Sequence, residues 1–381
     1  MGRPPAPQAV VLSVGSELLA GETVDTNAAF LGGRLRDLGV DLTEVRQLPD
    51  DRAVLAAAFR QAGGAADIVL VTGGLGPTHD DLTREGLADA LGEKLAADPV
   101  LEDELRERFG RLGSMPATNL RQAMRIPSAD ALPNPIGSAP GWWLDRGTEA
   151  VIALMPGVPS EMRRMFDEQV APRLAGRLGP VPLHVRTLKT FGIGESAVAE
   201  LLGPLLEEPG DGVISGIYAR DDGVHLRFTT REDPAAVDAA AARVRQVMGD
   251  RLWGEDGDDL AFVALTRFAA AGCATVASWE ADTGGALLAA LSAATPTGPA
   301  ASYVGGVLDS GGAPAAPAAD GCVQLSLLPE DSRGRSRVRV AVSGRVAVPR
   351  EELRIHGSGP QRLRRAAFAA LDHVRRSLPP G

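Results

Sequence analysis

Short strand-like runs alternate with longer amphipathic stretches along the N-terminal half of the chain. The runs at 9–14 and 67–72 are apolar and rich in β-branched residues, which is typical of strands buried inside a sheet. Further strands are expected at 41–47 and 150–154. Between the strands, apolar residues recur every three or four positions, as at 54–62, and this spacing predicts amphipathic helices. The alternation predicts a parallel, doubly wound α/β sheet.

The segment 67–83, DIVLVTGGLGPTHDDLT, combines a buried strand, a glycine-rich turn and the start of a helix. Gly73, Gly74 and Gly76 let the backbone turn sharply and approach a ligand closely, because no Cβ stands in the way. Unpaired amides and the dipole at a helix N-terminus both favour a bound anion. The segment therefore predicts a phosphate-binding turn.

Two carboxylates, Asp80 and Asp81, follow this turn and would repel a phosphate unless a divalent cation lay between them. A metal-assisted nucleotide or pyrophosphate site is therefore expected, with Mg²⁺, Mn²⁺ or Co²⁺ as the cation. The turn is not a Walker A loop, since the only lysines are Lys94 and Lys189 and neither follows a glycine. An alternative is that Asp80 or Asp81 only caps the helix.

Polar or glycine residues also follow the other predicted strands. Glu17 comes after the first strand, Asp50 after the second, and Pro156 and Gly157 after the last. Ligands of doubly wound sheets bind beyond the carboxyl ends of the strands, so these segments are expected to meet the glycine turn at one edge. Asp50 has a structural alternative, as the N-cap of the helix that starts at Asp51.

The second half of the chain follows a linker at 178–182 that is rich in glycine and proline. Residues 183–255 predict a small α+β unit. Its turn at 192–196 is expected to cap a helix rather than to hold RNA, because lysine and arginine do not flank it. Residues 258–381 are rich in alanine, glycine and proline, and 298–320 is nearly of low complexity.

Composition narrows the class of protein. A length of 381 residues suggests two or three domains, and 44% hydrophobic and 23% charged residues are ordinary for a globular protein. The net charge of −10 argues against general nucleic-acid binding, and the twelve arginines between 333 and 376 are expected to form a solvated face. No apolar stretch approaches a membrane span, and the first ten residues lack the hydrophobic region of a signal peptide. Cys273 and Cys322 provide neither a disulfide framework nor a metal site, so a cytoplasmic protein is expected.

Longer motifs occur in a fixed order: GSELLAGETVDTN from Gly15, GGLGPTHDDLT from Gly73, NLRQAMRIP from Asn119, NPIGSAPGWW from Asn134, PGVPSEM from Pro156 and KTFGIGES from Lys189. Over about 1–255 they resemble the CinA family of competence/damage-inducible proteins. The resemblance implies a doubly wound, molybdopterin-binding (MoaB/MogA-like) domain at 1–177 and a small KH-type α+β domain at 183–255. It also implies a reduced α/β domain at 258–381 and assembly as a homodimer.

For the first domain the resemblance implies divalent-metal-dependent hydrolysis of ADP-ribose to AMP and ribose 5-phosphate. Asp81 and Asp50 match the family's acidic positions and are the implied catalytic residues; with Asp80 they are also the implied metal ligands. The same motifs supply the residues expected to hold the nucleotide and its phosphates: Glu17, Asp25, Asn27, Gly73, Gly74, Leu75, Gly76, Pro77, Thr78, Asn134, Gly137, Pro156 and Gly157.

The last domain departs from the family pattern, which places a serine nucleophile in the sequence AESCTGG. This chain reads WEADTGG, so Ala281 stands at the serine position and Asp282 at the cysteine position. The tyrosine and lysine that the family carries downstream are missing, and the last lysine of the chain is Lys189. The NMN deamidase activity that the resemblance implies is therefore expected to be absent, unless Ser278 or Thr283 replaces the nucleophile.

Two other functions are compatible with these residues. The implied fold would also suit adenylyl transfer to a pterin-type acceptor, although fold analogy alone is weak support. A non-catalytic nucleotide-binding or scaffold protein is the third interpretation. The expected partner in each case is a small nucleotide, and neither a membrane nor a nucleic acid is expected.

Overall fold

The computed structural model describes residues 6–110, 113, 115–147, 149–179, 183–294, 298–309, 318–331 and 333–380. Two compact units, 1–183 and 184–381, form separately, and each is described by itself. The predicted linker at 178–182 lies at this division, and 180–182 fall outside the described residues. In the described part of the chain, none of the helices is both long and apolar enough to cross a membrane.

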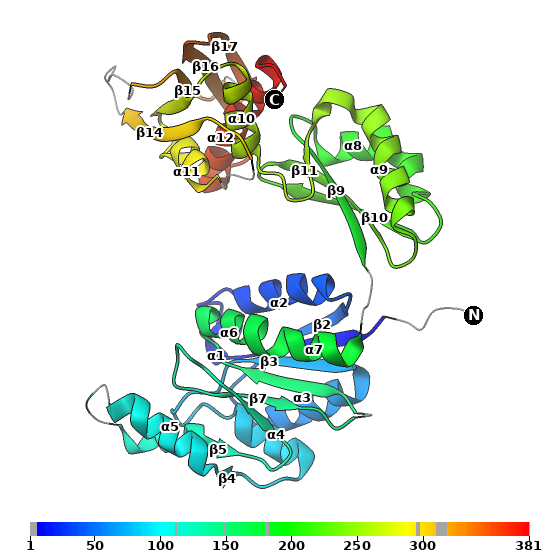
Figure 1. The fold of residues 1–381 in the computed structure, drawn as a ribbon, viewed down its shortest axis with the longest axis vertical. Helices are drawn as coiled ribbons and strands as arrows, with labels where there is room; N and C mark the ends of the chain where they lie inside the picture. The colour runs from blue at the N-terminus through cyan, green and yellow to red at the C-terminus, as the bar shows by residue number, and fades with distance from the viewer. Residues whose placement is uncertain are drawn as a thin grey trace. The chain divides into compact units, whose positions relative to one another are not determined.

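The first unit is built on a six-stranded sheet in the order β2-β1-β3-β8-β7-β6 (Figure 1). Four strands are parallel, as predicted: β2 (Asp41–Leu48), β1 (Gln8–Val14), β3 (Ile68–Thr72) and β8 (Val151–Met155). The prediction of a wholly parallel sheet is wrong at one edge, where β7 (Gly141–Leu144) and β6 (Asp130–Leu132) run antiparallel. Trp142 and Trp143 end the motif NPIGSAPGWW, whose prolines and glycines are typical of a loop, yet both lie in β7 and are buried.

Helices cover both faces of this sheet (Figure 1). Val10 and Leu12 of β1 face one core and Ala9 and Val11 face the other, so alternate residues of a strand buried on both sides serve two layers. The first layer is formed by α3 (Arg52–Ala65) and α4 (Thr83–Leu91), and the second by α2 (Thr26–Asp37), α6 (Pro159–Met165), the π-helix η2 (Phe166–Val170) and α7 (Ala171–Leu178). The predicted doubly wound fold is confirmed.

Smaller elements complete the first unit. They are α1 (Ser16–Leu19), β4 (Ala96–Ala97), α5 (Pro99–Gly110), the 3-10 helix η1 (Ala117–Ala123) and β5 (Met124–Arg125). Leu101 and Leu105 of α5 pack on Ala123 of η1 in a core of their own. This satellite core holds α5 next to the loop at 133–140.

The second unit begins with a four-stranded antiparallel sheet in the order β10-β11-β9-β12. The elements are β9 (His184–Thr190), α8 (Glu195–Glu207), β10 (Val213–Arg220), β11 (Gly223–Thr230), α9 (Pro234–Met248), η3 (Gly249–Arg251) and β12 (Leu252–Glu255). The α+β arrangement is as predicted, and Gly194 stands at the N-cap of α8.

The C-terminal part has a five-stranded sheet in the order β14-β13-β15-β16-β17. Its elements are α10 (Leu260–Ala270), β13 (Thr275–Ala281), α11 (Ala286–Ala293), β14 (Ser302–Asp309), β15 (Gly321–Leu328), β16 (Arg337–Gly344), β17 (Val348–Arg354) and α12 (Gly359–Ser377). The nearly low-complexity stretch at 298–320 thus contains a strand, while 310–317 lie outside the described residues. The expected solvated arginine face is wrong at Arg375, which is buried and bonded to Asp372.

Candidate functional site

A cavity of about 420 Å³ opens at the carboxyl ends of β1, β2, β3 and β8. We call it the strand-end cavity. Every predicted strand-end segment contributes to its lining: Val14, Gly15 and Glu17 after β1, Asp50 after β2, Gly73–Thr78 with Asp80 and Asp81 after β3, Pro156–Val158 after β8, and also Gln122, Ser138, Ala139 and Glu161. The structure therefore brings the predicted segments together at one edge of the sheet.

The glycine loop after β3 depends on the absence of side chains at two positions. Gly73 and Gly74 have φ of +100° and +63°, in the left-handed region that favours glycine. A Cβ on Gly73 would meet the Val14 carbonyl oxygen, and one on Gly74 would meet the Thr83 hydroxyl. The Gly157 position is less crowded, since an added Cβ there would lie 3.3 Å from the Gly73 Cα.

The first turn of α4 fixes the orientation of the glycine loop. The Thr83 hydroxyl donates to the Gly73 carbonyl oxygen at 2.8 Å, and the Thr83 amide donates to that of Gly74 at 3.2 Å. Arg84 Nη1 donates to the carbonyl oxygen of Leu75 at 2.9 Å. In a trans peptide the C=O of one residue and the N–H of the next point in opposite directions. The amides of Gly74, Leu75 and Gly76 therefore face away from α4, and successive amides of this kind form an anion-binding concavity.

Asp81 closes this loop instead of capping α4. Its Oδ1 accepts from the Gly76 amide and its Oδ2 from the Thr78 amide, each at 2.8 Å, and Oδ2 also accepts from the Thr78 hydroxyl. Leu82 holds the N-cap position of α4, so the capping alternative for Asp80 and Asp81 is wrong. Two of the amides expected to hold phosphate are thus bonded to Asp81, whereas those of Gly74 and Leu75 have no hydrogen-bond partner within the described residues.

Asp50 also lies in the cavity and is not a helix cap for α3. Asp51 is that cap, accepting from the amides of Ala53 and Val54. Asp50 Oδ2 accepts from both the amide and the hydroxyl of Ser16 at 2.8 Å, which ties the end of β2 to the turn after β1. Its Oδ1 makes no hydrogen bond to any residue that the structure describes.

The strand-end cavity is strongly acidic. Carboxylates line it at Glu17, Asp50, Asp80, Asp81 and Glu161, and its described lining residues include no lysine, arginine or histidine. The described residues contain no group of three His, Cys, Asp or Glu side chains poised to hold a metal. Carboxylate oxygens nevertheless suit Mg²⁺, which proteins usually hold by one or two carboxylates together with substrate phosphates and water. The donor set fits a cation that arrives with a phosphorylated ligand.

Asp25 and Asn27, two predicted ligand-binding residues, do not line the cavity. Asp25 is the N-cap of α2 and accepts from the Ala28 amide at 2.9 Å. Asn27 Nδ2 donates to the Thr72 hydroxyl at 3.0 Å and to the Gly157 carbonyl oxygen at 2.8 Å. Asn27 therefore holds the end of β3 beside the turn after β8, which is a structural task within the same motif.

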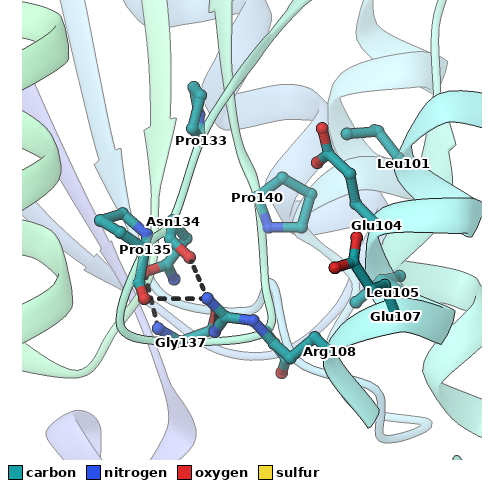
Figure 2. Close-up of a pocket in the computed structure, with 11 residues that line it drawn as sticks. Leu101, Glu104, Leu105, Glu107, Arg108, Pro133, Asn134, Pro135, Gly137 and Pro140 are labelled. Carbon is teal, nitrogen blue, oxygen red and sulfur yellow. Dashed lines mark hydrogen bonds between the residues drawn. The ribbon is translucent and has the colours of Figure 1, made fainter. Parts of the chain in front are cut away.

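A second cavity of about 500 Å³ lies between α5 and the loop at 133–140 (Figure 2). It shares Ser138 with the strand-end cavity. We call it the proline cavity; it is lined by Leu101, Glu104, Leu105, Glu107, Arg108, Pro133, Asn134, Pro135, Gly137, Ser138 and Pro140. The predicted residues Asn134 and Gly137 lie here instead of in the strand-end cavity. Asn134 Oδ1 accepts from the Gly137 amide at 2.9 Å, while its Nδ2 donates to Glu161 Oε2 at 2.7 Å.

Arg108 of α5 holds the loop that separates the two cavities. Figure 2 shows its guanidinium turned toward the loop, where it donates to the carbonyl oxygens of Asn134, Pro135 and Gly137. Sequence reasoning missed Arg84, Arg108 and Glu161. Glu161 lies within the quoted PGVPSEM motif, whereas nothing local marks the two arginines, because their partners are carbonyls far away in the sequence.

In the C-terminal part, Ala281 is the last residue of β13. Neither of the substitute nucleophiles has a free hydroxyl. Ser278 is fully buried with its Oγ 2.6 Å from the Tyr303 hydroxyl, and the buried Thr283 donates to Glu280 Oε2 at 2.7 Å. Glu280 also accepts from two amides at the start of α11. Each of the two hydroxyls is therefore hydrogen-bonded to a neighbouring side chain.

Solved structures are similar to the first unit. The CinA protein of Thermoplasma acidophilum is 35% identical and covers 44% of this chain and 98% of its own, with a TM-score of 0.42. The molybdopterin biosynthesis enzyme MoaB of Thermus thermophilus is 21% identical and covers 45% of this chain and 97% of its own, with a TM-score of 0.31.

Sequence comparisons define the family. Residues 10–176 match the model of a probable molybdopterin binding domain, and 185–254 match that of the damage-inducible protein CinA KH domain. The CinA-like protein of Thermomicrobium roseum is 44% identical over 66% of this chain and 63% of its own length, so the match spans slightly less than two thirds of that relative. The CinA-like protein of Deinococcus deserti is 45% identical over 73% of this chain and 69% of its own. The chain belongs to the family of CinA-like proteins.

Proposed function

We propose that the first unit hydrolyses the pyrophosphate bond of ADP-ribose to AMP and ribose 5-phosphate and needs a divalent cation to do so. The observation that supports this most is the strand-end cavity, which combines inward-facing loop amides with five carboxylates and no basic side chain in its described lining. Such a cavity would repel a bare phosphate but suits a phosphate that shares a cation with carboxylates.

Asp81 and Asp80 would hold the cation, which leaves Asp50 for proton transfer. A bound divalent cation supplies charge neutralisation at the phosphate oxygens and acidifies a water molecule. Asp50 Oδ1 is available to accept a proton from the attacking water, as a general base does. The water oxygen bonds to phosphorus as the bond from phosphorus to the bridging oxygen breaks. The amides of Gly74 and Leu75 are placed to stabilise the negative charge on the phosphate.

The proline cavity would accommodate the rest of the nucleotide. Its volume of about 500 Å³ is within the usual range for ligand pockets, about 300–1,000 Å³. Leucine and proline walls suit the faces of a planar ring, and the Glu104 carboxylate can accept from a ring amino group. Ser138 borders both cavities, so a single dinucleotide-like molecule could extend from one into the other.

A turnover panel tests the proposal. Purified full-length protein would be incubated with ADP-ribose and related nucleotides in Mg²⁺, Mn²⁺ or Co²⁺, and AMP and ribose 5-phosphate would be quantified by chromatography. We expect equimolar products that disappear in excess EDTA and return on addition of the metal. Undiminished turnover in EDTA would remove the metal from the proposal, and absence of turnover with every metal would remove the hydrolase.

Adenylyl transfer to a pterin-type acceptor is the second candidate. It is favoured by one observation, the match of residues 10–176 to a probable molybdopterin binding domain. Incubation with ATP and a pterin-type acceptor would distinguish the two reactions, since transfer yields an adenylylated pterin and pyrophosphate. Nucleotide binding without either reaction would indicate a non-catalytic protein.

A further inference from the structure

Arg84 lies behind the glycine loop and is almost fully buried, with 3% of its surface exposed. Its Nη1 donates to the Leu75 carbonyl oxygen at 2.9 Å and its Nη2 to that of Pro140 at 3.3 Å. The guanidinium carbon lies 6.0 Å from the ring centre of Trp142, and Nε is buried without a hydrogen-bond partner. In the described part of the chain no carboxylate hydrogen-bonds to this guanidinium.

A buried charge of this kind is costly to the folded state. Removing a guanidinium from water is unfavourable unless a paired counter-ion or a complete set of hydrogen bonds compensates. Arg84 has two hydrogen bonds, and the carboxylates of Glu85 and Asp81 attract it without bonding to it. Burial lowers the pKa of Arg84 to about 10, so the side chain still carries its charge at neutral pH. An apolar side chain of similar size could fill the space beside Trp142, but it would leave the Leu75 and Pro140 carbonyl oxygens without this donor. Packing alone therefore does not explain an arginine here.

The position of the charge suggests a reason for it. Arg84 bonds to the carbonyl side of the Leu75–Gly76 peptide, and the amide of that peptide donates to Asp81, a carboxylate that lines the strand-end cavity. Its second bond reaches Pro140, at the end of the loop that borders both cavities. The same guanidinium thus touches the two loops between which the proposed ligand would lie.

We propose that Arg84 is a positioning residue for a phosphate group: it fixes the glycine loop against the loop at 134–140 and provides positive potential from beneath the loop amides. Because the group is shielded from water, its field reaches the cavity with less screening than that of a surface arginine. It would offset part of the repulsion from the cavity carboxylates before any cation arrives. This inference rests on the proposed function only in taking a phosphorylated nucleotide as the ligand.

Binding of ADP in the presence of Mg²⁺ tests the inference, because the cavity carboxylates are expected to repel a phosphate that has no cation. Chromatography would check that the ADP stays intact. Isothermal calorimetry would compare wild type with Arg84→Met, Arg84→Gln and Arg84→Lys, and thermal unfolding would be measured on each. Arg84→Met should weaken ADP affinity by about tenfold or more, while Arg84→Lys, which keeps the charge, should retain most of it. Arg84→Gln, which can still donate to one carbonyl but carries no charge, should resemble Arg84→Met. Arg125→Met is the control, because Arg125 pairs with Asp98 away from both cavities and its loss should leave ADP affinity unchanged.

The outcomes separate this inference from the hydrolase. If Arg84→Met is folded and binds ADP like wild type, or if wild type binds no ADP, the inference is overturned. If Arg84→Met does not fold, equal ADP affinity of Arg84→Gln and Arg84→Lys overturns it, since only one of them is charged. Charge-dependent ADP binding by a protein that never hydrolyses ADP-ribose would support Arg84 and refute the hydrolase. Hydrolysis of ADP-ribose by Arg84→Met with an unchanged KM would support the hydrolase and refute the role of Arg84.

Discussion

Asp50 and Asp51 are neighbours in the sequence, but only Asp50 lines the strand-end cavity. Asp51 caps α3 through two amides, whereas Asp50 bonds Ser16 through one oxygen and keeps the other free of described partners. The pair therefore allows a chemical role to be tested against a structural one. We expect Asp50→Asn to lower kcat for ADP-ribose by about 100-fold or more, as loss of a general base does, with little change in melting temperature.

Asp51→Ala is the matched control for that substitution. Loss of the cap should reduce the free energy of unfolding by about 0.5–2 kcal/mol and leave kcat unchanged. Asp81→Ala should also lose most activity, but it frees the Gly76 and Thr78 amides and so reports on the loop as well as on the metal. Equal activity of Asp50→Asn and Asp51→Ala would show that Asp50 is not catalytic.

His373 gives the second unit a pH-dependent stability. The ring is buried and its Nδ1 lies 2.8 Å from Glu351, with Arg376 as the other charged neighbour. Burial lowers the pKa of His373 below its ordinary 6.5, outweighing the attraction of Glu351. The unfolded chain therefore takes up this proton at a higher pH than the folded chain does, and stability is lost as pH falls below 6.5. The melting temperature of wild type should fall more steeply than that of His373→Gln between about pH 7 and 5; parallel curves would contradict the assignment.

Residue-level prediction from the sequence worked where a motif is contiguous and failed where a contact is distant. The glycine turn, Asp81 and Asp50 were found because they stand at strand ends, which the apolar pattern locates. Arg84 could not be recognised, since its role depends on the carbonyl of Pro140, 56 positions away. Asn27 was expected to bind the nucleotide, and the sequence did not indicate that its side chain also joins the end of β3 to the turn after β8.

The segment formed by β3, the glycine loop and α4 is the part of the first unit that the sequence pattern defines most clearly. It was predictable because a buried strand, three glycines and an apolar helical stripe occur in direct succession. The edge hairpin β6–β7 was not, because Gly141 and the preceding prolines indicate a loop when tertiary burial of Trp142 and Trp143 is unknown. The spacing of apolar residues and the positions of glycine and proline locate the strands of the parallel sheet. The antiparallel edge strands depend on tertiary contacts that the local sequence pattern does not reveal.

The element's dependence on glycine can be measured directly. Gly73→Ala places a Cβ at a φ of +100° and against the Val14 carbonyl, so it should destabilise the first unit by about 1–3 kcal/mol and reduce turnover. Gly63→Ala is the control, because Gly63 lies in α3 with open space around it. It should stabilise the protein by about 0.5–1 kcal/mol, as alanine does inside a helix. Equal chemical denaturation midpoints for the two variants would mean that the loop accommodates the Cβ at position 73 without a loss in the free energy of unfolding.

At the scale of the whole molecule, the family resemblance predicts a homodimer. Light scattering at micromolar concentration should give twice the mass of the chain, and a monomer mass would count against the prediction.

The sequence predicted the KH-type part and the C-terminal α/β part of the second unit. It did not predict β14, which forms within a stretch of nearly low complexity. Two of the eight residues of β14 are glycine, a weak strand former, so this strand depends on its pairing with β13.

The C-terminal part is expected to be unable to deamidate NMN. Nucleophilic catalysis needs a hydroxyl or thiol and a group that activates it, and Ala281 at the end of β13 has neither. Ser278 is fully buried against the Tyr303 hydroxyl, whose pKa burial raises, so that phenol is a poor base at neutral pH. Thr283 donates to Glu280, but the same carboxylate is held by two helix amides. Purified wild type should release no ammonia from NMN above background, while a family member with the intact AESCTGG sequence serves as the positive control. Ammonia release that Ser278→Ala or Thr283→Ala abolishes, with the fold intact by circular dichroism, would show that the domain has kept its chemistry with a different nucleophile.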